Sequence, residues 1–280
     1  MEYLQRRVAL VEERMEAVVD DVEPDQLRTE LGDVVLAGGK RVRPAVTLLA
    51  CEAVGGEPAD AVDFGVGIEL VHNASLVVDD IIDRSRVRRG TPSAWAEYGH
   101  GSAIVTSDAL LGEAFALFSS NDRAMQIAAE SMVELGEGEA TELVDRPNTE
   151  AEYMTLARRK TGALFRAAAE LGAVAADADP FVVEAFGEYA ERVGVAFQIR
   201  DDVLDATAEA DDLGKPTGQD AEMDRPSVVQ VTGLSPSQAN ARAREEADAA
   251  TAALDSTDLP DTEAIEYLRD LAEFVVVRER

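Results

Sequence analysis

The stretch VDFGVGIELVHNASLVVDDIID, residues 62–83, determines how this sequence is expected to fold. Drawn as a helix, it is apolar on nearly every side, and such a helix belongs at the centre of a bundle. The stretch from Tyr189 to Leu204 has the same character. We therefore expect two central helices, each ending in a group of aspartates.

The rest of the sequence also carries helical signals. Alanine, leucine, glutamate and arginine are abundant, apolar residues recur at helical spacing, and no segment alternates as a β-strand would. Thr149 with Glu152, and Ser235 with Gln238, have the spacing of capping boxes, which begin helices. The sequence therefore predicts an all-α protein, a single-domain bundle of about ten or more helices around a central cavity, spanning residues 1–280.

Glycine and proline mark the expected breaks between helices, at residues 38–39, 55–56, 89–92 and at Pro180. One longer stretch, residues 206–226, follows the second aspartate group. Loops of that length in a compact domain are often functional. We expect this stretch to be unstructured and to act as a lid.

The chain is strongly acidic. Its 26 basic and 56 acidic residues give a formal net charge of −30 at pH 7. Such a charge repels nucleic acids and anionic membranes, so neither is an expected partner. Molar salt shortens the Debye length to about 3 Å and would screen the self-repulsion. Together with the near absence of lysine, this composition predicts a protein from a halophilic organism.

Features of the sequence that bear on location agree with one another. Cys51 is the single cysteine, which excludes an internal disulfide and fits a reducing compartment. The first residues lack the apolar core of a signal peptide, and no uninterrupted apolar run approaches the roughly 20 residues that a membrane span needs. We expect a cytoplasmic protein without a membrane span.

The two aspartate groups are candidate metal ligands. Asp79 and Asp83 are four positions apart and project from one helix face, and Asp201 and Asp205 repeat that spacing. In so acidic a chain the alternative is a solvated helix surface. The flanking apolar residues favour a metal, because buried carboxylates need a neutralising cation. Magnesium binds one or two carboxylates and fills its shell with water and phosphate oxygens, so a phosphorylated ligand is expected.

Basic residues are scarce and lie in short motifs. The three lysines, Lys40, Lys160 and Lys215, each stand beside glycine, threonine or arginine. Arg88 and Arg89 follow the first aspartate group and offer forked donors for phosphate. Any one of these residues could be an ordinary surface charge, but together they indicate an anion site.

The motifs, taken in order, resemble those of the trans-isoprenyl diphosphate synthases, the polyprenyl synthetase family, and particularly its geranylgeranyl type. They are GGKRVRP at 38–44, HNASLVVDDIID at 72–83, RRG at 88–90, KTG at 160–162, FQIRDDVLD at 197–205 and GKPTGQD at 214–220. The resemblance covers nearly the whole chain, and its final helices match weakly. It implies an isoprenoid-synthase fold, two substrates (isopentenyl diphosphate and an allylic prenyl diphosphate) and a homodimer.

The resemblance also implies roles for individual residues. Three magnesium ions would bridge the allylic diphosphate to six aspartates: Asp79, Asp80, Asp83, Asp201, Asp202 and Asp205. The same diphosphate would contact Arg88, Lys160, Thr161, Gln198 and Lys215, the two lysines among them taking part in catalysis. Isopentenyl diphosphate would be held by Lys40, Arg43, His72 and Arg89. Arg225 stands where the family usually has a lysine, which makes its contact less certain.

Product length is expected to depend on the residues one turn before Asp79. Ala74 and Ser75 are both small, whereas short-chain members of the family usually carry an aromatic residue there. Small residues favour products of twenty carbons or more. Simple helix packing explains small residues at these positions equally well.

Two other functions remain open on the sequence. One is another class I terpenoid synthase, which shares an aspartate helix but has no need of a second diphosphate site of the GGKRVRP type. The other is a non-catalytic prenyl diphosphate-binding subunit of a heteromeric synthase. The completeness of both aspartate groups favours an active enzyme.

Overall fold

The computed structural model describes residues 2–211 and 226–277 and is helical almost throughout, which confirms the all-α prediction. The chain divides into two compact units. Unit 1 comprises residues 1–128 and 171–177, and unit 2 comprises residues 129–170 and 178–280. Each unit is described by itself, and the single-domain organisation stays a prediction.

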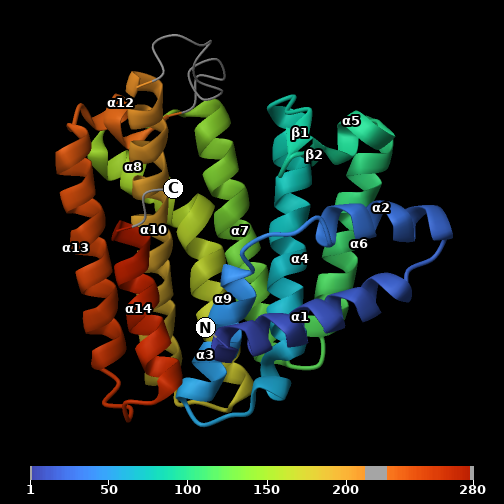
Figure 1. The fold of residues 1–280 in the computed structure, drawn as a ribbon, viewed down its shortest axis with the longest axis horizontal. Coiled ribbons are helices and arrows are strands. Elements are labelled where there is room, and N and C mark those ends of the chain that lie inside the picture. The colour runs from blue at the N-terminus through green and yellow to red at the C-terminus, as the bar shows by residue number, and fades with distance from the viewer. Residues whose placement is uncertain (1, 212–225, 278–280) are drawn as a thin grey trace. The chain divides into compact units, whose positions relative to one another are not determined.

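Unit 1 is arranged around one long helix, α4 (Pro58–Ile82). It packs against α1 (Glu2–Asp20), α2 (Asp25–Val35), α3 (Val42–Ala53), α5 (Ala94–Tyr98) and α6 (His100–Phe118), and α6 lies alongside it in Figure 1. The helix begins with proline in its first turn and a capping box of Glu57 and Asp60. It ends at the first aspartate group, as predicted.

The burial of α4 follows the predicted apolar character, with an exception near its end. Residues such as Phe64, Ile68 and Val71 are fully enclosed, but Val78 and Ile82 are each 42% exposed. The helix is therefore buried on all sides over most of its length and open on one side beside the aspartates.

A short β-ribbon follows α4, although no strand was expected. β1 (Val87–Arg88) pairs antiparallel with β2 (Thr91–Pro92). Arg89 (φ 51°) and Gly90 (φ 82°) form the two-residue turn, and hairpin turns of this kind require positive φ at both positions. The ribbon is too short to show an alternating pattern, and it carries Arg88 and Arg89 back toward α4.

Unit 2 is arranged around α10 (Pro180–Asp211), which packs against α13 (Pro236–Asp255) and α14 (Glu263–Val277) (Figure 1). Its other neighbours are α8 (Glu150–Ala157), the π-helix η1 (Arg158–Gly162) and α12 (Val228–Thr232). Two helices have residues in both units: α7 (Asp122–Val144) and α9 (Ala163–Ala175). Both predicted capping boxes are present, at the starts of α8 and α13.

The expected end of α10 was wrong. The helix does not stop at the second aspartate group but continues to Asp211, so residues 206–211 are helical rather than part of a loop. Residues 206–211 include three alanines and one glutamate, residue types that favour helix. The remainder of the expected lid, with Lys215 and Arg225, lies outside the described residues.

Among the described residues, two helices have the length and apolar composition that a membrane crossing would need, α4 and α6. The core helix of a soluble protein passes the same test, and 67% of the apolar window in α4 is buried within the protein. For α6 the buried share is 39%. This is weak evidence for a span in either helix.

Candidate active site

The first aspartate group forms the last turn of α4. Asp79 and Asp83 are both half-buried, and the backbone N–H of Asp83 donates to the carbonyl of Asp79 at 2.8 Å. Helical geometry places these two carboxylates on one face, one turn apart. Two oxygen ligands at this spacing suit a hard cation such as magnesium.

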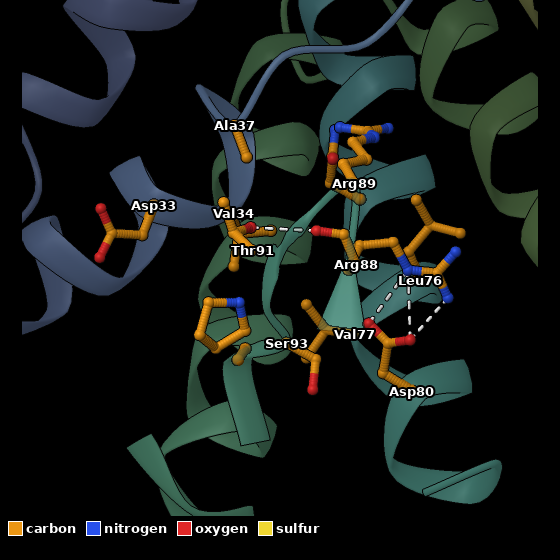
Figure 2. Close-up of a pocket in the computed structure, with 13 residues that line it drawn as sticks. Asp33, Val34, Ala37, Leu76, Val77, Asp80, Arg88, Arg89, Thr91 and Ser93 are labelled. Atoms are coloured by element: carbon orange, nitrogen blue, oxygen red, sulfur yellow. Dashed lines mark hydrogen bonds and ion pairs between the residues drawn. The ribbon is translucent and has the colours of Figure 1, made fainter. Parts of the chain in front are cut away.

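The middle aspartate of this group has a protein partner. Asp80 is 3% exposed, and the Arg88 guanidinium lies across its carboxylate (Figure 2). Nη2 of Arg88 is 2.6 Å from Oδ1, and Nε lies 3.1 and 3.2 Å from the two oxygens. Charge-assisted, forked contacts of this kind are strong. In this structure Asp80 therefore orients Arg88, whereas the sequence predicted both residues as ligand contacts.

The second aspartate group repeats this arrangement within unit 2. Asp201 is half-buried and Asp205 is exposed, while Asp202 is buried and accepts three hydrogen bonds. The donors are the Tyr153 hydroxyl at 2.7 Å, the Gln198 amide at 2.9 Å and the Val228 backbone N–H at 2.7 Å. Burial raises the pKa of Asp202 to about 6, and these three hydrogen bonds oppose that rise.

The KTG motif lies in the π-helix η1. π-helices are rare and often mark functional sites. The Thr161 hydroxyl donates to Oε1 of Gln198 at 2.7 Å, which extends the hydrogen-bond network of Asp202. Lys160 pairs instead with Glu139, at 3.3 Å, and with Glu142 on α7. The structure thus joins Thr161 and Gln198 to the second aspartate group and places Lys160 against carboxylates of a neighbouring helix.

A cationic group in unit 1 surrounds His72. The pKa of His72 lies well below its usual value because of burial and the charges of Arg43, Arg89, Arg88 and Arg41, so the imidazole is neutral. Burial also lowers the pKa of Arg43, to about 10, which leaves its guanidinium charged at neutral pH. The structure therefore brings three of the four predicted isopentenyl diphosphate contacts together, while the fourth, Lys40, is exposed in the preceding loop.

A small cavity of about 40 Å³ lies beside this cationic group (Figure 2). Arg88, Arg89 and Asn73 supply polar groups to its wall, and Leu76 and Val77 of α4 supply apolar ones. Asn73 is buried and donates to the Glu69 carbonyl at 2.7 Å. Asn73 was not predicted as a site residue.

The two residues predicted to set product length have different surroundings. Ala74 is 1% exposed, and its carbonyl accepts a hydrogen bond of 3.2 Å from Ser107 on α6. Ser75 is half-buried, and its hydroxyl donates to the His72 carbonyl at 2.8 Å. A larger side chain at position 74 would have to displace neighbouring atoms, because this position is buried. Their role in product length stays a prediction.

The described residues include no group of three or more aspartate, glutamate, histidine or cysteine side chains placed to hold a metal ion by themselves. Magnesium does not require such a group, since it completes its shell with water and substrate phosphate. The carboxylates of Asp79 and Asp83 in unit 1, and of Asp201 and Asp205 in unit 2, have the donor chemistry that magnesium prefers. Binding of both groups to one diphosphate stays a prediction.

Three residues of the site were not predicted from the sequence: Tyr153, Glu69 and Arg41. Tyr153 gave no signal, because its partner Asp202 lies 49 positions away. Glu69 could have been noticed as a single charge within an apolar helix. Arg41 lies within the GGKRVRP motif, but its burial, at 3% exposed, distinguishes it from its neighbours only in the structure.

Three comparisons with known proteins all identify the same family. The sequence model of the family described as Polyprenyl synthetase matches residues 24–262. A geranylgeranyl diphosphate synthase of Methanosarcina mazei is 36% identical, over 78% of this chain and 70% of that protein. The geranylgeranyl pyrophosphate synthetase structure from Geoglobus acetivorans has a TM-score of 0.85 and 31% identity, covering 98% of this chain and 99% of its own. A polyprenyl synthase structure from Caulobacter crescentus, complexed with calcium and isoprenyl diphosphate, has a TM-score of 0.88 and 26% identity, covering 100% and 97%.

Proposed function

Because the chain belongs to the polyprenyl synthetase family and is a trans-prenyltransferase that makes products of twenty carbons or longer, we propose a division of labour between its acidic and basic residues. The aspartates hold magnesium with the allylic diphosphate, and the cationic group of unit 1 holds isopentenyl diphosphate. The observation that carries this proposal is the place of His72, which lies among the charges of several arginines and close along α4 to two carboxylates on one helix face.

Isopentenyl diphosphate binds, in this proposal, to Lys40, Arg43, His72 and Arg89. Arginines give forked donors for a diphosphate, and the neutral imidazole can donate one hydrogen bond without adding to the crowding of positive charge. Burial of Arg43 strengthens its attraction for an anion, because fewer water molecules screen its charge. No metal is needed at this diphosphate.

The allylic diphosphate binds to the aspartate groups through magnesium, with Asp79, Asp83, Asp201 and Asp205 as the direct ligands. When bound, the metal stabilises the negative charge that develops on the leaving diphosphate. Asp80 and Asp202 belong to the same groups, and their hydrogen bonds with protein donors support a positioning role for them. Arg88, Lys160, Thr161, Gln198 and Lys215 contact the same diphosphate.

The reaction has a balanced outcome. The bond between the allylic carbon and the diphosphate oxygen breaks, and the double bond of isopentenyl diphosphate forms a new carbon–carbon bond with the allylic cation. The cation that results loses one proton, which the released diphosphate accepts. Water would capture the cation, so the site must exclude it. The protein residues bind and orient both diphosphates and stabilise the departing one.

One experiment tests the proposal against its rivals. The purified protein is incubated with labelled isopentenyl diphosphate and dimethylallyl, geranyl or farnesyl diphosphate in molar KCl, with magnesium or with EDTA, and the products are separated by chain length. We expect elongated prenyl diphosphates that require the metal. Cyclised or head-to-head products would support another terpenoid synthase, and activity that appears only on mixing with a second protein would support a non-catalytic subunit.

Further properties belong to the same proposal: three magnesium ions, a geranylgeranyl-length product, a homodimer, a cytoplasmic location and adaptation to high salt. The family resemblance supports the first three, the single cysteine supports the fourth, and the net charge of −30 supports the last.

A further inference from the structure

Arg41 is a buried arginine with a left-handed backbone conformation. It caps the start of α3 with φ 48° and ψ 38°, and its side chain is 2% exposed. A residue with a Cβ rarely adopts this conformation, and a buried guanidinium needs a partner for its charge. Both requirements fall on one residue, which stands between Lys40 and Arg43.

The guanidinium of Arg41 connects three helices of unit 1. Its Nη2 donates to the Val35 carbonyl, the last residue of α2, at 2.7 Å. Its Nη1 donates to Oε1 of Glu69, within α4, at 3.0 Å. Its Nε lies 3.9 Å from the carboxylate of Glu12 on α1. These contacts hold the segment that leads into α3 against α1, α2 and α4.

Glu69 is the buried counter-charge of this region. It is 3% exposed and lies ten residues before Asp79 on the same helix. Besides its contact with Arg41, its charge acts on Arg43 and Arg89, where it opposes the lowering of the pKa by burial. The carboxylate of Glu69 thus offsets part of the positive charge of Arg41, Arg43 and Arg89.

The loop before Arg41 is held on its other side by Arg89. The Arg89 guanidinium donates to the Gly38 carbonyl, and a Cβ on Gly39 (φ 142°) would lie only 3.2 Å from Cζ of Arg89. The loop backbone therefore lies directly against one predicted ligand contact. A shift of Arg41 would move this backbone, and with it Lys40.

We propose that Arg41 and Glu69 form a positioning pair for the diphosphate of isopentenyl diphosphate. Neither residue touches the ligand: the pair fixes the backbone of residues 38–43, so that Lys40 and Arg43 meet the diphosphate in a set geometry. This inference rests on the proposed function, which assigns that diphosphate to the same region.

The Glu69→Gln variant distinguishes a positioning role of Glu69 from a purely electrostatic effect of its charge on the ligand. If Glu69 only added negative charge near the site, its removal would tighten the binding of an anion. If it positions Arg41, the removal weakens binding. We expect the KM for isopentenyl diphosphate to rise about tenfold or more, as for the loss of a hydrogen bond to a charged group, with kcat and the KM for the allylic substrate within about threefold of wild type.

Binding is measured separately by calorimetry with isopentenyl diphosphate in EDTA, which keeps the aspartate groups out of the measurement. Arg41→Met should weaken binding as Glu69→Gln does, and the double variant should be little worse than the more severe single variant, because both remove one interaction. Asp63→Asn is the matched control. Asp63 is also on α4 and also pairs with an arginine, Arg14 at 2.7 Å, but the two side chains are 37% and 49% exposed and contact neither Arg41 nor Glu69, so this variant should leave binding unchanged.

Several results would overturn the inference: equal or tighter binding by Glu69→Gln, the same loss in Asp63→Asn, or a fall in kcat at constant KM. Should Glu69→Gln fail to fold, Arg41→Lys answers the question, since it keeps the charge but loses the fork that joins Val35 to Glu69. It should weaken binding several-fold, and unchanged binding would refute the pair. Failure of the proposed function would look different, because wild-type protein would then make no prenyl product.

Discussion

The Tyr153 hydroxyl donates a 2.7 Å hydrogen bond to Oδ2 of Asp202, between residues 49 positions apart in sequence. This contact connects α8 to the second aspartate group. Burial raises the pKa of Asp202 to about 6, and the hydrogen bond from Tyr153 is the first of those that oppose the rise. The ionisation of Asp202 therefore depends on the phenol.

Tyr153→Phe should move the acid limb of the pH–rate profile to higher pH. Without the phenol, the pKa of Asp202 rises further above its value of about 6, so more of this carboxyl is protonated near neutral pH. We expect kcat near pH 6 to fall about tenfold, with partial recovery at pH 8, in line with a hydrogen bond of about 1.5–3 kcal/mol to a charged group. The measurement is kcat from pH 5 to 9.

Tyr189→Phe is the matched control for this prediction. Tyr189 is also fully buried, and its hydroxyl donates to the Leu268 carbonyl at 2.6 Å, away from any carboxylate. This variant should lose roughly 1 kcal/mol of stability without a shift of the acid limb. Equal shifts in both variants would mean that general loosening of unit 2, rather than the contact with Asp202, is responsible.

Asp79→Ala and Asp201→Ala should each abolish most turnover while the helices remain folded. Each removes a proposed metal ligand, and we expect kcat to fall by about 10²-fold or more, as when a group that stabilises transition-state charge is removed. Circular dichroism checks the fold, and magnesium titration of the residual rate checks the ligand role. Asp108→Ala, at an exposed aspartate on α6, is the control. Near-normal rates in either site variant would contradict the metal assignment.

Ala74→Tyr should shorten the product, and it should also destabilise unit 1. Ala74 is 1% exposed, so an aromatic ring at this position must displace buried neighbours. Overpacking of this kind costs about 1–3 kcal/mol. Products are compared by chromatography and stability by thermal melting. Ser75→Tyr is the companion variant, and an unchanged product spectrum in both would mean that the chain-length limit lies elsewhere.

Concentrated KCl should stabilise the protein strongly. A net charge of −30 repels itself in dilute buffer, and molar salt screens that repulsion. We expect the melting temperature to rise by more than about 5 °C between 0.1 and 2 M KCl, which for a chain of this size corresponds to a stability gain above roughly 1 kcal/mol. Sucrose of equal osmolality is the control for excluded-solute effects. No rise in KCl beyond that in sucrose would refute adaptation to salt.

Cys51 should resist alkylation in the native protein. Burial, reinforced by nearby carboxylates, raises the pKa of its thiol to about 12 from 9.0. Because only the thiolate reacts, three pKa steps mean about 10³-fold less reactive species below pH 9, before limited access is counted. Iodoacetamide labelling of native and urea-unfolded protein at pH 8 measures the ratio. Similar rates in both states would contradict the burial of this thiol.

The raised pKa of the Cys51 thiol also makes the unfolding free energy depend on pH. The folded state holds the thiol proton more tightly than the unfolded state, so the contribution of Cys51 is fully present below the unfolded pKa near 9. It is lost as the pH rises from there toward about 12. Cys51→Ala should therefore show a smaller loss of unfolding free energy over this alkaline range than wild type.

Local signals in the sequence predicted the local features of the fold. The capping boxes at Thr149 and Ser235 and the end of α4 at the first aspartate group all lie where spacing and residue type placed them. The extension of α10 to Asp211 replaces part of the expected loop, because three alanines and one glutamate in residues 206–211 favour helix.

Features that depend on distant partners could not be predicted. The sequence treats the aspartates of each group alike, but Arg88 holds Asp80 and Tyr153 holds Asp202, and both contacts arise from tertiary structure. The left-handed backbone of Arg41 is equally hidden, since arginine gives no hint of positive φ. What the sequence specified was the chemistry of the site, and the fold decided which residues orient the others.

The π-helix η1 has a consequence for how this protein could be altered. A π-turn holds one residue more than an α-turn, and removing a single residue between Arg158 and Gly162 would restore regular α-helix. Each residue of an α-helix turns the chain by about 100° and advances it by about 1.5 Å. The wider π-turn accommodates one extra residue without that rotation, so the deletion would keep the helix unbroken and leave α8, with Tyr153, on the face that it presents to Asp202. A one-codon loss within this π-turn would therefore change how Thr161 meets Gln198 and leave the contact of Tyr153 with Asp202 in place.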